Sequence, residues 1–170
     1  MSKPKIRKTG KGDAPYIYIL IGKSIGGGDF LLPRRENEIR ELIRKESFFV
    51  AVGEGNVVGC ASLEEYEGVA ELRSLAVEEK WRGRGLGENL IKRVAGLARK
   101  SYDTLYTFAD ESLVEYYKGQ GFEDKGRFIT EGRTLDINRG ISRKLERYCL
   151  DCDRYKSGLC NEHLMHKQLS

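Results

Sequence analysis

The sequence has little that would divide it, place it in a membrane or send it out of the cell. Only three of its 170 residues are proline, and it contains no Pro-rich linker, low-complexity tract or internal repeat. No apolar run reaches the roughly 18 residues that a membrane span needs, and no signal peptide opens the chain. We therefore expect a cytoplasmic protein of about the size of one ordinary domain.

The sequence also has little net charge outside its first residues. Residues 1–12 hold five lysines or arginines and no acid. Since the formal net charge of the whole chain is +4, the net charge of the remaining residues is −1. A nearly neutral body does not support a broad nucleic-acid surface. The basic N-terminus leaves open one alternative to an enzyme, namely an RNA-binding module with a non-catalytic core.

Cysteine occurs in two places only. Cys60 stands alone in an apolar stretch, where a small core residue is expected. The other three cysteines lie near the C-terminus, as a Cys-x-x-Cys pair followed by a third cysteine and two histidines. This spacing offers soft ligands for zinc, although three reduced cysteines on a helix and loop are the alternative. The predicted zinc ligands are Cys149, Cys152, Cys160 and His163, with His166 as a substitute for His163.

Strand and helix signals alternate along the chain, which predicts an α/β (α+β) fold with a central mixed sheet. Expected strands are Lys5–Thr9, Phe48–Val52, Val57–Leu63, Val69–Val77, Thr104–Phe108 and one that starts at Gly121. Expected helices are Glu36–Lys45, Gly85–Lys100 and Ser112–Lys118, the last capped by Ser112. Tyr16–Ile21 is ambiguous, because its residues favour a strand while Asp13 and Pro15 before it favour a helix.

The most informative stretch is an apolar strand that runs through an Arg- and Gly-rich loop into an amphipathic helix. Glycines allow a tight turn and close approach to a ligand, and a helix N-terminus binds phosphate. A dinucleotide fingerprint fails here, because Glu88 stands where the third glycine is required. The loop and the helix start are expected to bind the phosphates of a cofactor. The expected cofactor-binding residues of the strand, loop and helix start are Leu75, Ala76, Val77, Arg82, Gly83, Arg84, Gly85, Leu86, Gly87 and Glu88.

Two motifs resemble those of the GNAT superfamily of N-acetyltransferases. Arg82-x-x-Gly85-x-Gly87 is similar to the family's signature for the pyrophosphate of acetyl-CoA, and Tyr116–Phe122 is similar to its aromatic-Tyr-x-x-x-Gly-Phe element. The resemblance covers the chain from about Lys5 to Phe122. It implies a mostly antiparallel sheet with a splayed parallel strand pair flanked by helices, acetyl-CoA as co-substrate and a homodimer. It also implies that Ala14–Ser24 is helical.

The same resemblance implies roles for particular residues. The backbone N–H of Val77 would stabilise the acetyl oxygen, and Tyr117 would protonate the departing sulfur of CoA. The base is a separate prediction from position: Glu71, on the strand that leads to Val77, is the candidate to take the proton of the acceptor amine directly or through a water, and a solvated carboxylate at a strand end is the alternative. Glu64 and Glu65, at the end of the preceding strand, are rivals for that role.

Further segments resemble the short, single-domain N-acetylglutamate synthases. These segments are Leu31-Leu32-Pro33-Arg34, Gly59–Leu63 followed by Ala70–Val77, and the tail that ends in Cys160-Asn161-Glu162. The resemblance implies acetylation of L-glutamate or a related amino acid in arginine biosynthesis, with protein N-termini or polyamines as alternative acceptors. Because guanidinium groups match carboxylates, Arg34 and Arg73 are expected beside such an acceptor. We expect an acetyltransferase domain over residues 1–140 and a Cys/His-rich extension over 141–170.

Overall fold

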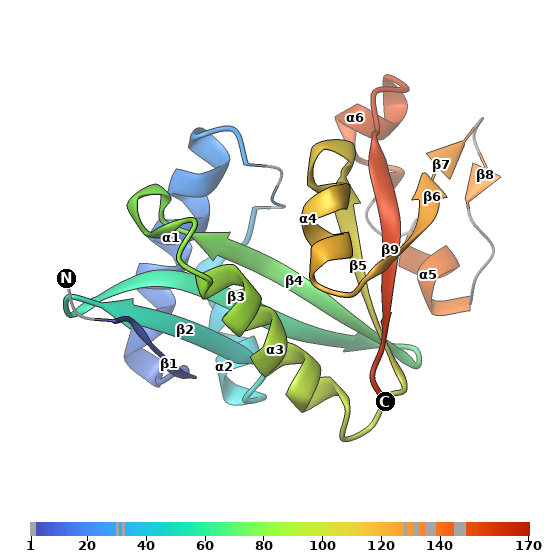
Figure 1. Cartoon of the computed structure of the whole chain (residues 1–170). Coiled ribbons are helices and arrows are strands. Elements are labelled where there is room, and N and C mark those ends of the chain that lie inside the picture. The colour runs from blue at the N-terminus through green and yellow to red at the C-terminus, as the bar shows by residue number, and fades with distance from the viewer. Residues whose placement is uncertain are drawn as a thin grey trace. The chain divides into compact units, whose positions relative to one another are not determined.

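The computed structural model describes residues 3–29, 31, 33–127, 129–130, 133–134, 139–144 and 149–170, so Leu32 lies outside the described residues. The chain divides into two compact units. Unit 1 consists of Met1–Glu64 and Leu72–Ser101, and unit 2 consists of Glu65–Glu71 and Tyr102–Ser170. The hydrogen-bonded strand order is β1-β2-β3-β4-β5-β9-β6 (Figure 1). A separate two-stranded ladder joins β7 (Ile129–Thr130) and β8 (Arg133–Thr134).

Unit 1 is built on the strands β1 (Lys5–Lys8), β2 (Phe48–Gly53), β3 (Asn56–Tyr66) and most of β4 (Val69–Val77). Because side chains alternate along a strand, β2 supplies two apolar faces. Phe48 and Val50 pack with helices α1 (Ala14–Gly26) and α2 (Glu36–Arg44), whereas Ala51 packs with the start of α3 (Leu86–Ala98). The sheet of unit 1 therefore has two helices on one face and one on the other (Figure 1).

The ambiguous N-terminal segment is helical, as the family resemblance implies. The helix α1 follows the short 3-10 helix η1 (Lys11–Asp13) and has Pro15 in its first turn. Ile17, Leu20 and Ile21 are buried, while Tyr16, Tyr18 and Ile19 are about half exposed. Spacing of three and four residues gives one buried stripe, and that tertiary burial outweighs the strand propensity of the segment.

Strand β4 contains an irregularity in its second half. Ser74 has φ of +53°, which is uncommon for a residue other than glycine. Its carbonyl accepts a hydrogen bond from Sγ of Cys60 (3.3 Å), and Oγ of Ser62 donates to the carbonyl of Arg73 (3.1 Å). Two side chains of β3 thus satisfy backbone carbonyls at the point where β4 bends, immediately before Leu75, Ala76 and Val77.

Unit 2 is built on β5 (Thr104–Asp110), β9 (Glu162–Gln168) and β6 (Glu123–Arg127), with β9 antiparallel to both of its neighbours. Ala70 and Glu71 of β4 pair in parallel with Leu105 and Tyr106 of β5. The remaining elements of this unit are the helices α4 (Val114–Gly119), α5 (Arg139–Lys144) and α6 (Asp153–Lys156) and the short helix η3 (Glu111–Leu113).

The mixed sheet with one parallel strand pair and flanking helices confirms the predicted fold class. Two details differ from the prediction. The side chain of Asp110, not that of Ser112, caps the helical turn, because Asp110 accepts from the backbone N–H of Ser112 at 3.0 Å. The C-terminal segment also forms a strand, β9. In the described part of the chain, none of the helices combines the length and apolar character that crossing a bilayer requires.

Candidate active site

The glycine-rich loop of unit 1 connects β4 to α3 as predicted. Gly83 and Gly85 have φ of +70° and +75°, the left-handed region in which glycine lacks the Cβ penalty. Gly85 is also the N-cap of α3 and offers no side chain to the first amides of the helix. The N–H groups of the first turn, at Leu86, Gly87 and Glu88, therefore suit an anion such as a pyrophosphate.

A buried tryptophan anchors this loop. Trp81, in the 3-10 helix η2 (Glu79–Trp81), is 1% exposed and packs with Leu86 and Ala51. A Cβ added to Gly53 of β2 would lie 2.9 Å from the indole ring. The close approach of β2 and the indole fixes the position of the loop against the sheet of unit 1.

The two arginines of the loop are held by other groups of unit 1. Arg82 donates from Nε to the carbonyl of Val77 (2.9 Å) and pairs with Asp29 (2.6 Å). The guanidinium of Arg84 lies 5.2 Å from the centroid of the Trp81 ring, within the range of a cation–π contact. Both cations therefore lie close to the loop backbone. Arg84 adds positive potential to that of the helix N-terminus, while Asp29 compensates part of the charge of Arg82.

Gly85→Ala tests whether the loop needs the left-handed conformation. An added Cβ has space, since the nearest atom is Nδ2 of Asn89 at 3.9 Å, so the cost comes from backbone strain of roughly 1–2 kcal/mol. We expect a KM for acetyl-CoA about tenfold higher, because 1.4 kcal/mol corresponds to a factor of ten. Gly96→Ala in the same helix is the matched control, with an unchanged KM and higher stability. Equal effects of the two substitutions would contradict this role of Gly85.

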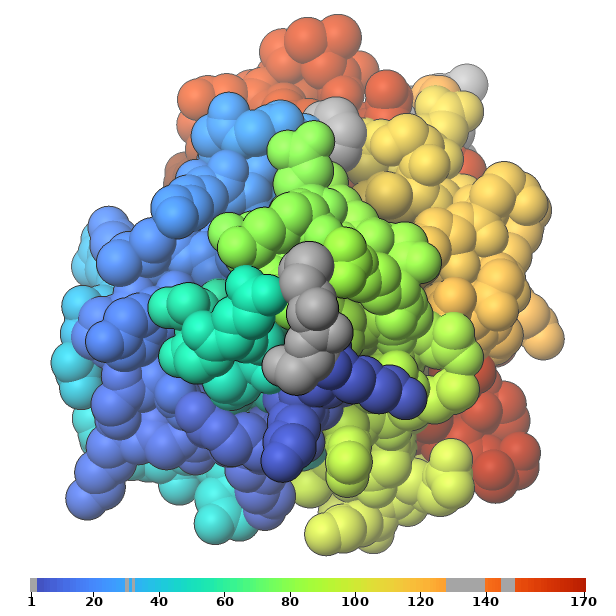
Figure 2. Space-filling model, turned by 60° about the vertical axis from the view of Figure 1, so that its left-hand side comes forward, coloured from blue at the N-terminus to red at the C-terminus, as the bar shows by residue number. Residues whose placement is uncertain are grey.

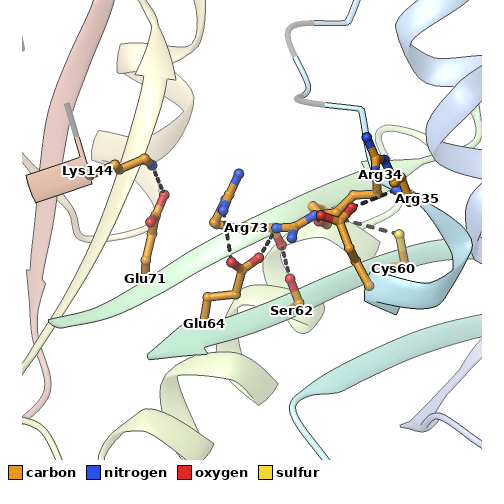
Figure 3. Close-up of polar contacts among 10 residues, drawn as sticks. Arg34, Arg35, Cys60, Ser62, Glu64, Glu71, Arg73 and Lys144 are labelled. Carbon is orange, nitrogen blue, oxygen red and sulfur yellow. Dashed lines mark hydrogen bonds and ion pairs between the residues drawn. The ribbon is translucent and has the colours of Figure 1, made fainter. Parts of the chain in front are cut away.

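The predicted acceptor cations, Arg34 and Arg73, lie together in unit 1 and share one carboxylate (Figure 3). A nitrogen of Arg34 contacts Oε1 of Glu64, and Nη1 of Arg73 donates to Oε2 of the same residue at 2.9 Å. Both arginine side chains are 9% exposed and that of Glu64 is 15% exposed. We call Arg34 and Arg73 the arginine pair.

The arginine pair is tied to the irregularity of β4. Nε of Arg34 donates to Oγ of Ser74 at 3.1 Å, which connects the segment before α2 to β4. Arg73 precedes Ser74 in the same strand. The burial of the Cys60 thiol behind this strand raises its pKa to about 12, so Cys60 is the neutral core residue that the sequence predicts. Arg73 and Val77 belong to the same strand, so Arg73 of the arginine pair lies four residues before the end of β4.

Tyr117 lies in unit 2, on α4, and is 7% exposed, whereas its neighbour Tyr116 is 40% exposed. Its ring packs edge-on against Phe122, with centroids 5.5 Å apart. Burial raises the pKa of the Tyr117 phenol above its ordinary value and nearby Tyr116 adds to this, while a hydrogen bond with Thr107 acts in the opposite direction. The phenol is therefore neutral over the working pH range and has a proton to give.

Glu71, the predicted base, is 2% exposed and forms an ion pair with Lys144 of α5 (Figure 3). Nζ of Lys144 also lies 3.7 Å from the centroid of the Phe108 ring. All three residues belong to unit 2. Sequence reasoning did not identify Lys144, because it lies 73 residues from Glu71 in a segment without a recognisable motif.

The rival carboxylates have other neighbours. Glu64 is held between the arginines of the arginine pair. Glu65 is exposed and lies close to Tyr102, whose pKa is raised by burial and by the charge and hydrogen bond of Glu65. Of the three predicted candidates, Glu71 is the one whose carboxylate is buried beside a lysine.

The three C-terminal cysteines are neighbours in unit 2, with free thiols. Burial raises the pKa of Cys149 to about 11, and the charges of Glu162, Cys160 and Cys152 contribute in the same direction while Lys144 opposes them. Burial likewise raises the pKa of Cys160. Zinc binds cysteine as the thiolate, so the burial of Cys149 and Cys160 opposes the form of the side chain that a metal site requires.

His163, the predicted fourth zinc ligand, is directed elsewhere. Its Nδ1 lies 3.0 Å from Oδ1 of Asp124 on β6. Cys149 packs in a cluster with Leu164, which follows His163 in β9. Because adjacent residues of a strand face opposite sides of the sheet, His163 faces away from Cys149. Within the described ranges, no three His, Cys, Asp or Glu side chains are arranged to hold a metal ion. As placed, His163 is not grouped with the cysteines, and the zinc site of Cys149, Cys152, Cys160 and His163 stays a prediction.

The basic N-terminal residues contribute to a groove on unit 1. The groove has a volume of about 280 Å³. It is lined by Lys8 of β1, by Lys92 and Arg93 of α3, and by Lys100, which follows α3. In Figure 2 the dark-blue residues of β1 lie beside the green residues of α3. Lys8 pairs with Glu46 at 2.7 Å, so part of this positive charge is compensated.

Comparison with known proteins gives a consistent set of similarities. Residues 44–124 match the family model described as an acetyltransferase (GNAT) domain. The chain is 28% identical over 151 residues to the "uncharacterized N-acetyltransferase CT2212" of Chlorobaculum tepidum, an alignment that covers 88% of this chain and 86% of the relative.

Solved structures with a similar fold include the following two. N-acetylglutamate synthase from Neisseria gonorrhoeae, complexed with coenzyme A and N-acetyl-glutamate, matches with a TM-score of 0.75 and 25% identity over 100% of this chain. The chain spans only 36% of the length of that synthase. Rv2747 from Mycobacterium tuberculosis, in complex with CoA, matches with a TM-score of 0.74 and 24% identity over 98% of this chain and 100% of its own.

Proposed function

We propose that this chain, a GNAT N-acetyltransferase that uses acetyl-CoA, acetylates the amino group of L-glutamate or of a related amino acid. The observation that carries the choice of acceptor is the arginine pair. Its two buried guanidiniums bind the two oxygens of the Glu64 carboxylate, so this site is able to hold a carboxylate. An amino acid presents a carboxylate close to its amine, and guanidinium groups recognise carboxylates through two parallel hydrogen bonds. The similarity to a synthase complexed with N-acetyl-glutamate supports the same class of acceptor.

In the proposed reaction the residues of this chain have three tasks. The loop from Arg82 to Gly85 and the start of α3 hold the pyrophosphate of acetyl-CoA. The backbone N–H of Val77 stabilises the acetyl oxygen as it gains charge, a contribution worth roughly a hundred- to a thousandfold in rate. As the amine nitrogen bonds to the acetyl carbon and the carbon–sulfur bond breaks, Glu71 takes a proton from the amine and Tyr117 gives one to the sulfur.

The test of this function is acetyl-CoA-dependent release of free thiol with a panel of acceptors. The panel contains glutamate, glutamine, aspartate, spermidine and a peptide with a free N-terminus. We expect the highest kcat/KM with glutamate, because the arginine pair places positive charge at the acceptor. Turnover of spermidine or the peptide without turnover of amino acids would support acetyltransferase activity but refute an amino acid as the acceptor.

Arg34→Gln measures the contribution of the arginine pair. Loss of a charge-assisted hydrogen bond worth about 1.5–3 kcal/mol predicts a KM for glutamate raised about 10- to 150-fold, with the KM for acetyl-CoA unchanged. The matched control is Arg35→Gln, since Arg35 is the adjacent, exposed residue. A KM for glutamate that responds equally to both substitutions would refute a specific role for Arg34.

A further inference from the structure

The arginine pair already holds a carboxylate that belongs to the chain itself. Glu64 lies between Arg34 and Arg73, and each of its two oxygens contacts a different guanidinium (Figure 3). We propose that Glu64 is an internal competitor for the acceptor, so that the carboxylate of an incoming amino acid must replace it. This inference rests on the proposed function, in which the same arginine pair binds the acceptor.

The geometry of Glu64 is that of a bound carboxylate ligand. Arginine binds carboxylates with its N–H groups directed at the oxygens in the carboxylate plane, and two arginines can share one such group. Nη1 of Arg73 donates to Oε2 at 2.9 Å, and Arg34 contacts Oε1. An acceptor carboxylate that used the same donors would need the position that Glu64 occupies.

Glu64 is also the member of this group that can leave at the lowest cost. Its side chain is 15% exposed, against 9% for each arginine, and it lies near the end of β3. Arg34 has a second contact, from Nε to Oγ of Ser74, which does not depend on Glu64. A change in the side-chain rotamer of Glu64 would thus expose the arginine pair without breaking the backbone pairing of β3.

An internal carboxylate reduces the apparent affinity for an external one. Because it is attached to the chain, its effective concentration at the arginine pair reaches the millimolar range or above. Only the fraction of molecules in which Glu64 has left can bind the acceptor, and the apparent dissociation constant rises by the inverse of that fraction.

The test uses glutarate, a five-carbon dicarboxylate that has no amine and therefore cannot be acetylated. Its binding to the wild-type protein and to Glu64→Gln is measured by isothermal titration calorimetry. We expect glutarate to bind Glu64→Gln about tenfold more tightly, because the neutral amide no longer competes for the arginines. Glu65→Gln, which changes the adjacent exposed carboxylate, is the matched control and should leave the affinity unchanged.

Affinity for glutarate that is equal to or weaker than that of the wild type would overturn the proposal, because a purely structural Glu64 would leave the arginines less well positioned in the variant. Thermal unfolding shows whether Glu64→Gln is folded.

If Glu64→Gln is not folded, Glu64→Asp provides the same test, since the shorter aspartate side chain keeps the charge but holds both arginines less well. An intermediate increase in affinity is then expected, and no increase would overturn the proposal.

Turnover assays separate this inference from the proposed function. Tighter glutarate binding by Glu64→Gln, without acetylation of glutamate by either protein, would support the internal competitor and refute the acceptor. Acetylation of glutamate by both proteins, with unchanged affinity for glutarate, would support the acceptor and refute the internal competitor.

Discussion

Tyr117→Phe is expected to lower kcat by about 100- to 10,000-fold, the range that general acid catalysis contributes. The substitution keeps the ring, which packs 5.5 Å from Phe122, and removes only the hydroxyl. The raised pKa of the buried phenol keeps the proton in place, so the loss of kcat should be similar at neutral and mildly alkaline pH. Single-turnover measurement of thiol release checks the chemical step directly.

The control for this substitution is Tyr116→Phe. Tyr116 is the adjacent aromatic residue, is 40% exposed and should leave kcat unchanged. Because Tyr117→Phe also removes a hydrogen bond with Thr107, a stability loss of about 1 kcal/mol is expected and is measured by chemical denaturation. A fall in kcat of less than about tenfold, in a folded variant, would exclude Tyr117 as the general acid.

Lys144→Met is expected to lower the free energy of unfolding by about 3–5 kcal/mol, because it leaves Glu71 as a buried carboxylate without its lysine. The side chains of Lys144 and Glu71 are 7% and 2% exposed, so water cannot replace the lost partner at little cost. The loss of the contact between Nζ of Lys144 and the Phe108 ring acts in the same direction. Urea denaturation followed by circular dichroism measures the change.

The adjacent residue supplies the matched control for this prediction. Arg143 pairs with Glu67 at 2.6 Å, but the two side chains are 55% and 38% exposed. Arg143→Met should therefore cost less than about 1 kcal/mol. The double variant Lys144→Met, Glu71→Leu should recover much of the stability, because it removes both charges. A single Lys144→Met variant as stable as Arg143→Met would refute a stabilising ion pair.

The glycine-rich loop can be predicted from the sequence because its conformation is determined locally. Gly83 and Gly85 adopt positive φ, and α3 starts directly after them. The same holds for β2, where an unbroken apolar run predicts a strand and the structure buries both of its faces. The helix α1 is harder, since the local propensity of Tyr16–Ile21 favours a strand and the burial of one face decides the outcome.

The partners of the charged site residues cannot be predicted in this way. Composition and spacing identify Arg34, Arg73 and Glu71 as candidates, but not Glu64 as the carboxylate between the arginines or Lys144 as the partner of Glu71. Such pairings depend on which segments the fold brings together. The strand β9 escaped prediction for a related reason: only Leu164 and Met165 are buried at its centre, so it lacks an apolar alternation.

The place of β9 in the sheet has a consequence for synthesis on the ribosome. All residues of unit 1 precede β9 in the chain, so unit 1 can fold while translation continues. In unit 2, β5 and β6 both pair with β9, which is translated last of the three strands. The nascent chain therefore exposes the edges of β5 and β6 that pair with β9 until β9 itself has been translated, and unpaired strand edges are where chaperones or other chains bind.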